Sequence, residues 1–201
     1  MKGLEDLNYC VKNFFPLGHE SGVRLSAGYL TELSEICPEM REFRIRCVRF
    51  DSWPQFNKPW TSLVTLWLLH VEVEHDDGFA SLGAPGVFPN LRNFKMESCR
   101  LLLSSRRSRV ASELSPSRTP LLMPDLRSCQ SLETVILSYV DLKFPGSPQD
   151  ELPFPLGLKK LVTNRASVSD FTSSDLKVTV ENTLDNCDFK MLNEPFVLRA
   201  W

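Results

Sequence analysis

Apolar residues recur at fixed offsets between residues 40 and 171. Five segments align so that positions 1, 4, 6, 9 and 11 of each unit are apolar, and 24 of these 25 positions hold an apolar residue. From an overall apolar content of 42%, about ten or eleven apolar residues would be expected at 25 positions. Polar residues between the apolar ones are typical of a strand with one buried face. The units contain Met40, Phe43, Ile45, Val48 and Phe50; Leu63, Leu66, Leu68, Val71 and Val73; Leu91, Phe94, Met96, Cys99 and Leu101; Leu132, Val135, Leu137, Val140 and Leu142; and Leu158, Leu161, Thr163, Ala166 and Val168.

The unit pattern resembles the leucine-rich repeat, L-x-x-L-x-L-x-x-(N/C)-x-L. Successive units begin 23, 28, 41 and 26 residues apart. Only Cys99 keeps the Asn or Cys of position 9, which in the family bonds to the turn backbone, so we expect irregular turns. The resemblance implies an α/β fold: a solenoid formed by a short arc of parallel strands with helical or irregular return segments. An ordinary mixed α/β domain without repeats is the alternative.

A helix is predicted just before the first unit. The order of this helix, Cys37-Pro38 and the strand from Met40 resembles the C-P-x-L-x-x-L-x-L entry of repeats in F-box proteins. That resemblance implies substrate recognition for a ubiquitin ligase, with the chain as its adaptor. No F-box stretch of the L-P-x-E kind precedes the repeats, so we expect a fragment or a stand-alone relative. The apolar helix face comprises Leu25, Tyr29, Leu30, Leu33 and Ile36.

We expect a single domain over residues 1–201. Residues 1–39 form an N-terminal unit and helix, residues 40–171 form the five units, and residues 172–201 close the domain. Within the closing segment, the alternation of Leu176, Val178 and Val180 predicts a final strand.

The spacing of 41 residues between the third and fourth units exceeds a usual unit by roughly 15. Residues 104–120 are rich in serine, arginine and proline, which predicts a flexible insertion. Ser112 follows Arg109 by three residues, and Ser115 and Thr119 each precede a proline. These three are candidate phosphorylation sites, whose phosphates would pair with arginine. The alternative is a surface insertion whose short motifs carry no function.

The charge and cysteine content favour an intracellular, cytoplasmic or nuclear protein. The formal net charge is −2, which gives no reason to expect nucleic acid or a membrane as partner. The strongly apolar stretch Trp60–Val73 is too short to cross a membrane. Glu5 and Asp6 interrupt the apolar run that a signal peptide needs. The six cysteines form no C-x-x-C pair, so we expect free thiols.

We expect a protein that is not an enzyme and carries no catalytic residue, metal or cofactor. The segment G-H-E-S-G, residues 18–22, has Glu20 where a nucleophile elbow has serine. The acidic segment E-V-E-H-D-D-G, residues 72–78, matches no calcium or zinc spacing. The alternatives are a hydrolase or metal enzyme with a scattered site that includes Asp76 or Asp77, and a structural fragment of a larger solenoid.

Positions 2, 3, 5 and 7 of each unit are predicted to face away from the core, on the concave surface of the arc. On the second unit they include Trp67 and Leu69, with Arg44, Arg46 and Lys95 at matching positions of the neighbouring units. Tryptophan and arginine dominate the energetics of protein interfaces. We therefore expect these five residues to bind a protein partner. We also expect the chain to be a monomer or part of a hetero-complex. The alternative is that another part of the same chain covers Trp67.

Overall fold

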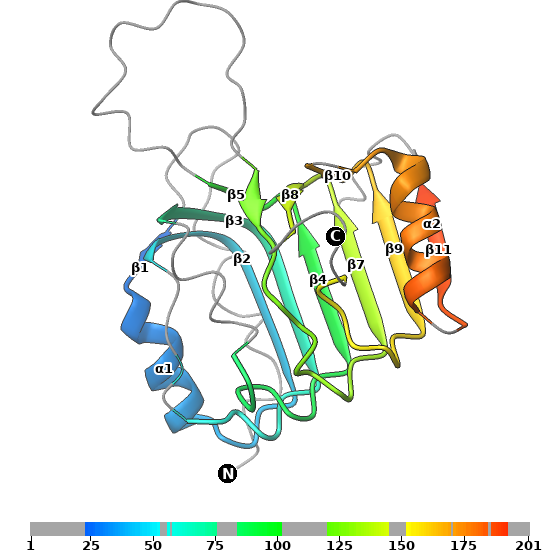
Figure 1. The fold of residues 1–201 in the computed structure, drawn as a ribbon. Helices are drawn as coiled ribbons and strands as arrows, with labels where there is room; N and C mark the ends of the chain where they lie inside the picture. The colour runs from blue at the N-terminus through cyan, green and yellow to red at the C-terminus, as the bar shows by residue number, and fades with distance from the viewer. Residues whose placement is uncertain are drawn as a thin grey trace, which may run out of the picture.

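The structure is a computed structural model that describes residues 23–52, 56, 58–75, 84–101, 120–144, 152–169, 171–184 and 186–192. Short strands dominate these residues, and two helices lie near the two ends of the described chain (Figure 1). The elements are β1 (Val23–Leu25), α1 (Ala27–Ile36), β2 (Glu42–Ser52), β3 (Thr65–His75), β4 (Asn93–Glu97), β5 (Arg100–Leu101), β6 (Leu121–Leu122), β7 (Thr134–Ser138), β8 (Asp141–Lys143), β9 (Lys160–Asn164), β10 (Ser167–Val168), α2 (Ser173–Thr183) and β11 (Asp188–Leu192).

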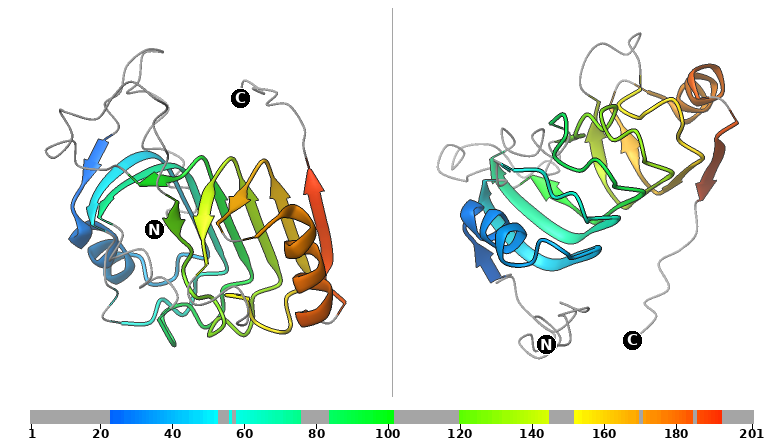
Figure 2. Two further views of the ribbon diagram at one scale, coloured as in Figure 1. Left: turned by 45° about the horizontal axis from the view of Figure 1, so that its top comes forward. Right: turned by 90° about the horizontal axis from the view of Figure 1, so that it is seen from below.

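The strands form two parallel sheets, which confirms the predicted α/β class with parallel strands. The main sheet has the order β1-β2-β3-β4-β7-β9-β11, and β5 pairs with β3. The second sheet has the order β10-β8-β6. Parallel neighbours require a return segment between them, and the described parts of these segments lie on one side of the main sheet (Figure 2).

The strand register agrees with the alignment of the five units. Residues at position 3 pair across the sheet, from Glu42 through Thr65, Asn93 and Thr134 to Lys160. The strand β11 continues this register, with Asp188 opposite Lys160. A one-residue slip would reverse the face of every side chain, so the apolar pattern identified both the strands and their pairing.

The apolar positions of the units build one hydrophobic core. Of the 25 aligned positions, 23 are buried, and the other two, Leu101 and Ala166, pack against the core while partly exposed. The helices lie on this side of the sheet, because Leu33 of α1 and both Leu176 and Val180 of α2 belong to the same core. Burial of a large apolar side chain contributes about 1.5–3 kcal/mol before entropy is subtracted.

Each unit enters its strand through the same turn. The position 1 N–H donates to the carbonyl three residues earlier in all five units, for example from Leu91 to Phe88 at 3.3 Å and from Leu132 to Cys129 at 2.9 Å. A ladder of side chains links three of these turns to the preceding unit. Asn90 Nδ2 donates to the Thr61 carbonyl at 2.7 Å, and Ser131 Oγ donates to the Pro89 carbonyl at 3.0 Å. Ser62 Oγ donates in the same way to the Pro38 carbonyl.

The prediction of irregular turns at the other end of the strands is wrong. Position 8 adopts a left-handed conformation in every unit, with φ between 48° and 54°. Backbone bonds hold this bend, since the Ser98 N–H donates to the Ser138 carbonyl at 2.9 Å and the Tyr139 N–H to the Asn164 carbonyl at 2.8 Å. The side chain of position 9 is therefore not required for regularity. The five residues at position 8 are Cys47, His70, Ser98, Tyr139 and Arg165.

The helix before the first unit is confirmed as α1, but its predicted face is only partly correct. Leu25 belongs to β1, and the side chain of Ile36 is 76% exposed. The helix ends directly after Ile36, where the Cys37 N–H bonds to the Leu33 carbonyl at 2.8 Å. Leu33 remains buried and packs in the core.

The predicted strand through Leu176, Val178 and Val180 is wrong, because these residues lie in α2. Leu176 and Val180 are buried one helical turn apart, whereas Val178 is 54% exposed. Thr172 and Asp175 form a capping box that starts the helix. The closing strand is β11, which follows α2.

The predicted insertion begins and ends at strands of different sheets. Before it, β5 pairs with β3, and after it, β6 pairs with β8. Leu101 and Leu121 thus stand opposite position 11 residues of the units on either side, Val73 and Leu142. Residues 102–119, including Ser112, Ser115 and Thr119, lie outside the described part of the chain.

Candidate protein-binding surface

One face of the main sheet carries the side chains of positions 3, 5 and 7, and we call it the outer face; the residues at position 2 lie just before the strands. In β4, Phe94 and Met96 point to the core, whereas Asn93, Lys95 and Glu97 alternate with them and are partly exposed. Among the described outer-face residues, only Ser138 and Val162 are buried. The alternation places polar and apolar side chains from six adjacent strands on one surface.

The register brings the five predicted binding residues together. Arg44 of β2 pairs with Trp67 of β3, which pairs with Lys95 of β4. Two residues further along, Arg46 pairs with Leu69. Neighbouring parallel strands are about 4.8 Å apart, so the five side chains occupy one patch on three strands.

Trp67 lies between two cations supplied by the neighbouring strands. The guanidinium carbon of Arg44 lies 3.8 Å from the centre of the indole ring, and Lys95 Nζ lies 5.4 Å from it. A cation over an aromatic face contributes about 0.5–1 kcal/mol at exposed sites. These contacts fix the orientation of the indole while leaving it partly exposed.

Two carboxylates that sequence reasoning missed complete the patch. Arg44 Nε donates to Glu42 Oε1 at 2.5 Å, and Lys95 Nζ lies 2.7 Å from Glu97 Oε2. In both pairs the two residues are two positions apart on one strand, which places them on the same face. In the sequence, these ion pairs are indicated by residues of opposite charge two positions apart on one strand. Arg46 makes no ion pair with any residue that the structure describes.

His70 borders the patch at position 8, and from the sequence alone no partner could be assigned to it. Its backbone is left-handed, with a φ of 52°. Burial lowers its pKa, the charges of Arg46 and Lys95 lower it further, and Glu97 acts in the opposite direction. A lowered pKa keeps His70 neutral at pH 7, so it adds no charge to the patch.

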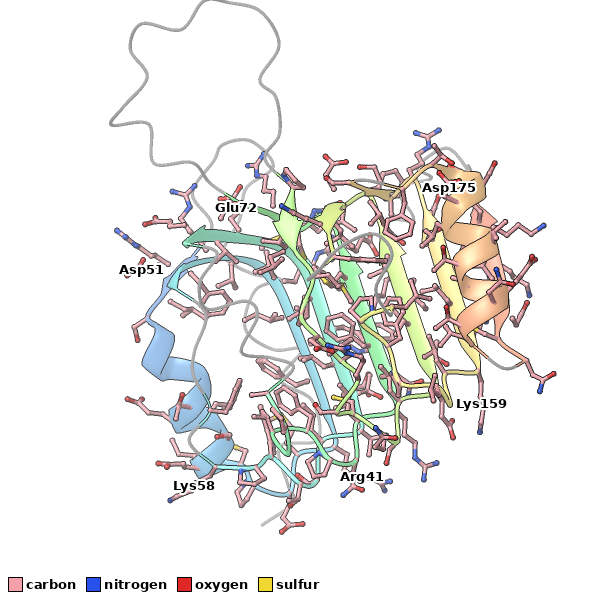
Figure 3. All side chains as sticks on the ribbon, in the orientation of Figure 1. Arg41, Asp51, Lys58, Glu72, Lys159 and Asp175 are labelled. Carbon is pink, nitrogen blue, oxygen red and sulfur yellow. The ribbon has the colours of Figure 1, made fainter. Side chains whose placement is uncertain are left out.

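The carboxylates Glu72 and Glu74, which begin the acidic segment of residues 72–78, are paired with arginines. Glu72 accepts from Arg49 Nη2 at 2.9 Å and from Arg100 Nε at 2.7 Å. Arg24 Nη2 donates to Glu74 Oε2 at 3.0 Å and also pairs with Asp51. Glu72 and Asp51 lie at the end of the strands opposite Arg41 and Lys159 (Figure 3).

Burial alone would raise the pKa of Glu72, but hydrogen bonds and charge from Arg100 and Arg49 outweigh it and hold that pKa below its ordinary value. The side chain of His75 and residues 76–78 lie outside the described part of the chain, as does the segment of residues 18–22.

Within the described residues, His, Cys, Asp and Glu side chains form no group of three or more that could hold a metal ion. Five of the cysteines are described, and each is a free thiol: Cys37, Cys47, Cys99, Cys129 and Cys187. Burial raises the pKa of Cys99 to about 12 and that of Cys129 to about 11. Neither described helix has the length and apolar content needed to span a membrane.

Comparison of the chain with protein-family models, with curated proteins and with solved structures finds no match in any of the three.

Proposed function

We propose that this chain is a leucine-rich-repeat-like solenoid that acts as a non-enzymatic protein-binding module. The partner binds on the outer face, which is the concave face of the arc, over the patch formed by Arg44, Trp67 and Lys95 with Arg46 and Leu69. The observation that carries this proposal is the partly exposed Trp67, held between two cations on a sheet face opposite the core.

The repeated geometry supports the solenoid. Five units share the same entry turn, the same buried positions and the same left-handed residue at position 8. Units that cannot bury their apolar side alone gain a continuous core by stacking. A strand face built from repeated units offers an extended surface whose residues at positions 3, 5 and 7 vary without cost to the core.

The composition of the patch supports a protein as the partner. Interface hot spots are enriched in tryptophan and arginine, and a rigid aromatic side chain loses little conformational entropy when it is buried. Trp67 is already oriented by Arg44 and Lys95. By the resemblance to F-box proteins with leucine-rich repeats, we propose that the partner is a substrate for ubiquitin ligation. The free thiols support an intracellular location.

Site-directed photo-crosslinking tests the proposed face. A photoreactive amino acid replaces Leu69 at the patch or Lys190 at the far end of the same face, and both chains are expressed in cells. We expect position 69 to yield a discrete crosslinked partner that position 190 does not yield.

The control is the photoreactive chain with Trp67→Ala, which should lose the crosslinked product while keeping its thermal unfolding midpoint within a few degrees. Equal crosslinking from positions 69 and 190, or an unchanged product in the Trp67→Ala chain, would place the partner elsewhere.

A further inference from the structure

The outer face differs in charge from the chain as a whole. The whole chain has a formal net charge of −2, yet among the strand residues of this face cations outnumber carboxylates by five to three. Surface potential of one sign attracts and orients a partner of the other sign. The cations are Arg44, Arg46, Lys95, Lys160 and Lys190, and the carboxylates are Glu42, Glu97 and Asp188.

Two of the cations around the apolar centre are held in place before any partner arrives. Arg44 is held by the indole of Trp67 and by Glu42, and Lys95 by Trp67 and Glu97. Arg46 is exposed and has no ion-pair partner among the described residues. Arg44 and Lys95 are already oriented and lose less entropy on binding, and Arg46 adds a charge that no described carboxylate pairs with.

The same contacts make the patch unsuitable for a cationic side chain. Arg44 and Lys95 already approach the ring of Trp67, which removes the aromatic surface that a lysine or arginine of a partner would need. The apolar atoms that remain belong to Leu69 and to the exposed part of the indole. The patch therefore combines a small apolar centre with cations around it.

Given the proposed function, we propose that the occupant of this patch is an extended acidic segment of the partner protein. In that segment, Asp or Glu residues flank a large apolar side chain. The apolar side chain packs on Leu69 and Trp67, and the carboxylates accept from Arg46 and from Arg44 or Lys95. Charge-assisted pairs of this kind are short, and arginine forms them with two parallel bonds.

A nucleic acid fits this face less well than a peptide. Single-stranded nucleic acid is bound by a continuous cationic groove with stacked aromatic side chains. Here Glu42 and Glu97 lie beside the two central cations, so the cationic surface is interrupted and does not form the continuous groove that a phosphate backbone follows. A peptide carries its carboxylates at separate positions and also offers N–H donors, so it can place a donor where the face has a carboxylate.

Selection of short random peptides displayed on phage tests the proposal. The full chain is the target, and the Trp67→Ala chain is used in a parallel selection. We expect peptides enriched on the wild-type chain alone to carry more Asp and Glu than Lys and Arg, around a large apolar residue. Arg46→Glu should weaken the leading peptide about tenfold, whereas Lys190→Glu should change its affinity by less than about twofold. Circular dichroism shows whether each variant keeps its fold.

The outcomes separate this inference from the proposed function. Peptides that are neutral or basic, yet depend on Trp67, would overturn the acidic partner and leave the binding face intact. If no peptide distinguishes the wild-type chain from Trp67→Ala, both proposals fail. A single-stranded thymidine oligonucleotide that binds as tightly as the leading peptide and displaces it would assign the patch to nucleic acid instead.

Discussion

Leu66 and Leu69 are the same residue type on the same strand, but they lie on opposite faces of the sheet. Leu66 is 3% exposed and belongs to the core, while Leu69 lies on the outer face and is partly exposed. Leu66→Ala should lower the free energy of unfolding by about 2–5 kcal/mol, because it removes buried methyl groups and leaves a cavity.

The matched variant is Leu69→Ala, which should lower the free energy of unfolding by less than about 1 kcal/mol. Urea denaturation of both variants measures the difference. Equal losses would mean that the assignment of the two faces is wrong.

Thr163 is the one polar residue among the 25 aligned apolar positions, and it is 2% exposed. Its hydroxyl finds no hydrogen-bond partner among the described residues. Other units hold isoleucine, leucine or methionine at this position. A buried hydroxyl without a partner costs about 1–3 kcal/mol, so Thr163→Val, which keeps the shape of the side chain, should stabilise the protein by about that amount.

The control for this substitution is Thr134→Val, at a partly exposed position of the outer face. It should change the free energy of unfolding by less than about 0.5 kcal/mol. Denaturation midpoints of both variants are the measurement, and a destabilised Thr163→Val chain would show that the hydroxyl is bonded in solution.

At the scale of single elements, the bend at position 8 gives each unit its shape. In each of the five units, the bend places one non-glycine residue in the left-handed region. That conformation costs a residue with a side chain about 1–2 kcal/mol of conformational free energy. For Ser98, we therefore expect Ser98→Gly to be more stable than Ser98→Ala by about 1 kcal/mol.

The order of stability should reverse in a helix, where glycine destabilises the fold by about 0.5–1 kcal/mol relative to alanine. Val178 of α2 is 54% exposed and provides this comparison, with Val178→Gly less stable than Val178→Ala. Thermal unfolding of the four variants measures both differences. Alanine and glycine of equal stability at position 98 would argue against the left-handed bend in solution.

The strands were predictable because burial of one face imposes a period of two on the sequence, and repetition fixes the register. The left-handed bend was not predictable, since its residues share no chemical type: Cys47, His70, Ser98, Tyr139 and Arg165. At Ser98, Tyr139 and Arg165 the bend is accompanied by a backbone bond to the next strand of the sheet, and the sequence of a single unit does not reveal such a bond.

Element type was less predictable in the closing segment. Leu176, Val178 and Val180 fit a strand by alternation, but Thr172 and Asp175 begin a helix through their side chains. Local capping outweighed a short apolar alternation. In the patch, the position of Trp67 between Arg44 and Lys95 could be predicted from the alignment of the units. The ion pairs of Arg44 with Glu42 and of Lys95 with Glu97 depend on side-chain conformations that only the structure provides.

Across the whole molecule, charge is distributed differently at the two ends of the strands. One end carries Arg41, Arg92 and Lys159 at position 2, all exposed. At the other end, arginines and carboxylates pair with each other across β1, β2, β3 and β5. Glu72 is the centre of that network because it bonds to arginines on both neighbouring strands.

The network should make stability depend on pH through Glu72. Its pKa is held below the ordinary value in the folded chain, so the folded state favours the ionised form more than the unfolded chain does. The resulting stabilisation is present above the unfolded pKa of about 4.3 and is lost as pH falls through the lower, folded pKa. Glu72→Gln should therefore destabilise the protein at neutral pH and have a smaller effect at acidic pH, as measured by denaturation at both.

Glu181→Gln is the control, because Glu181 is an exposed residue of α2 whose ion pair with Lys177 has an N–O distance of 3.7 Å. It should have little effect at either pH, since an exposed ion pair contributes about 0–1 kcal/mol. A Glu72→Gln effect that stays the same from neutral to acidic pH would mean that Glu72 contributes by packing alone. An effect that shrinks with acidity would show that paired charges hold the first strands of the sheet together at this end.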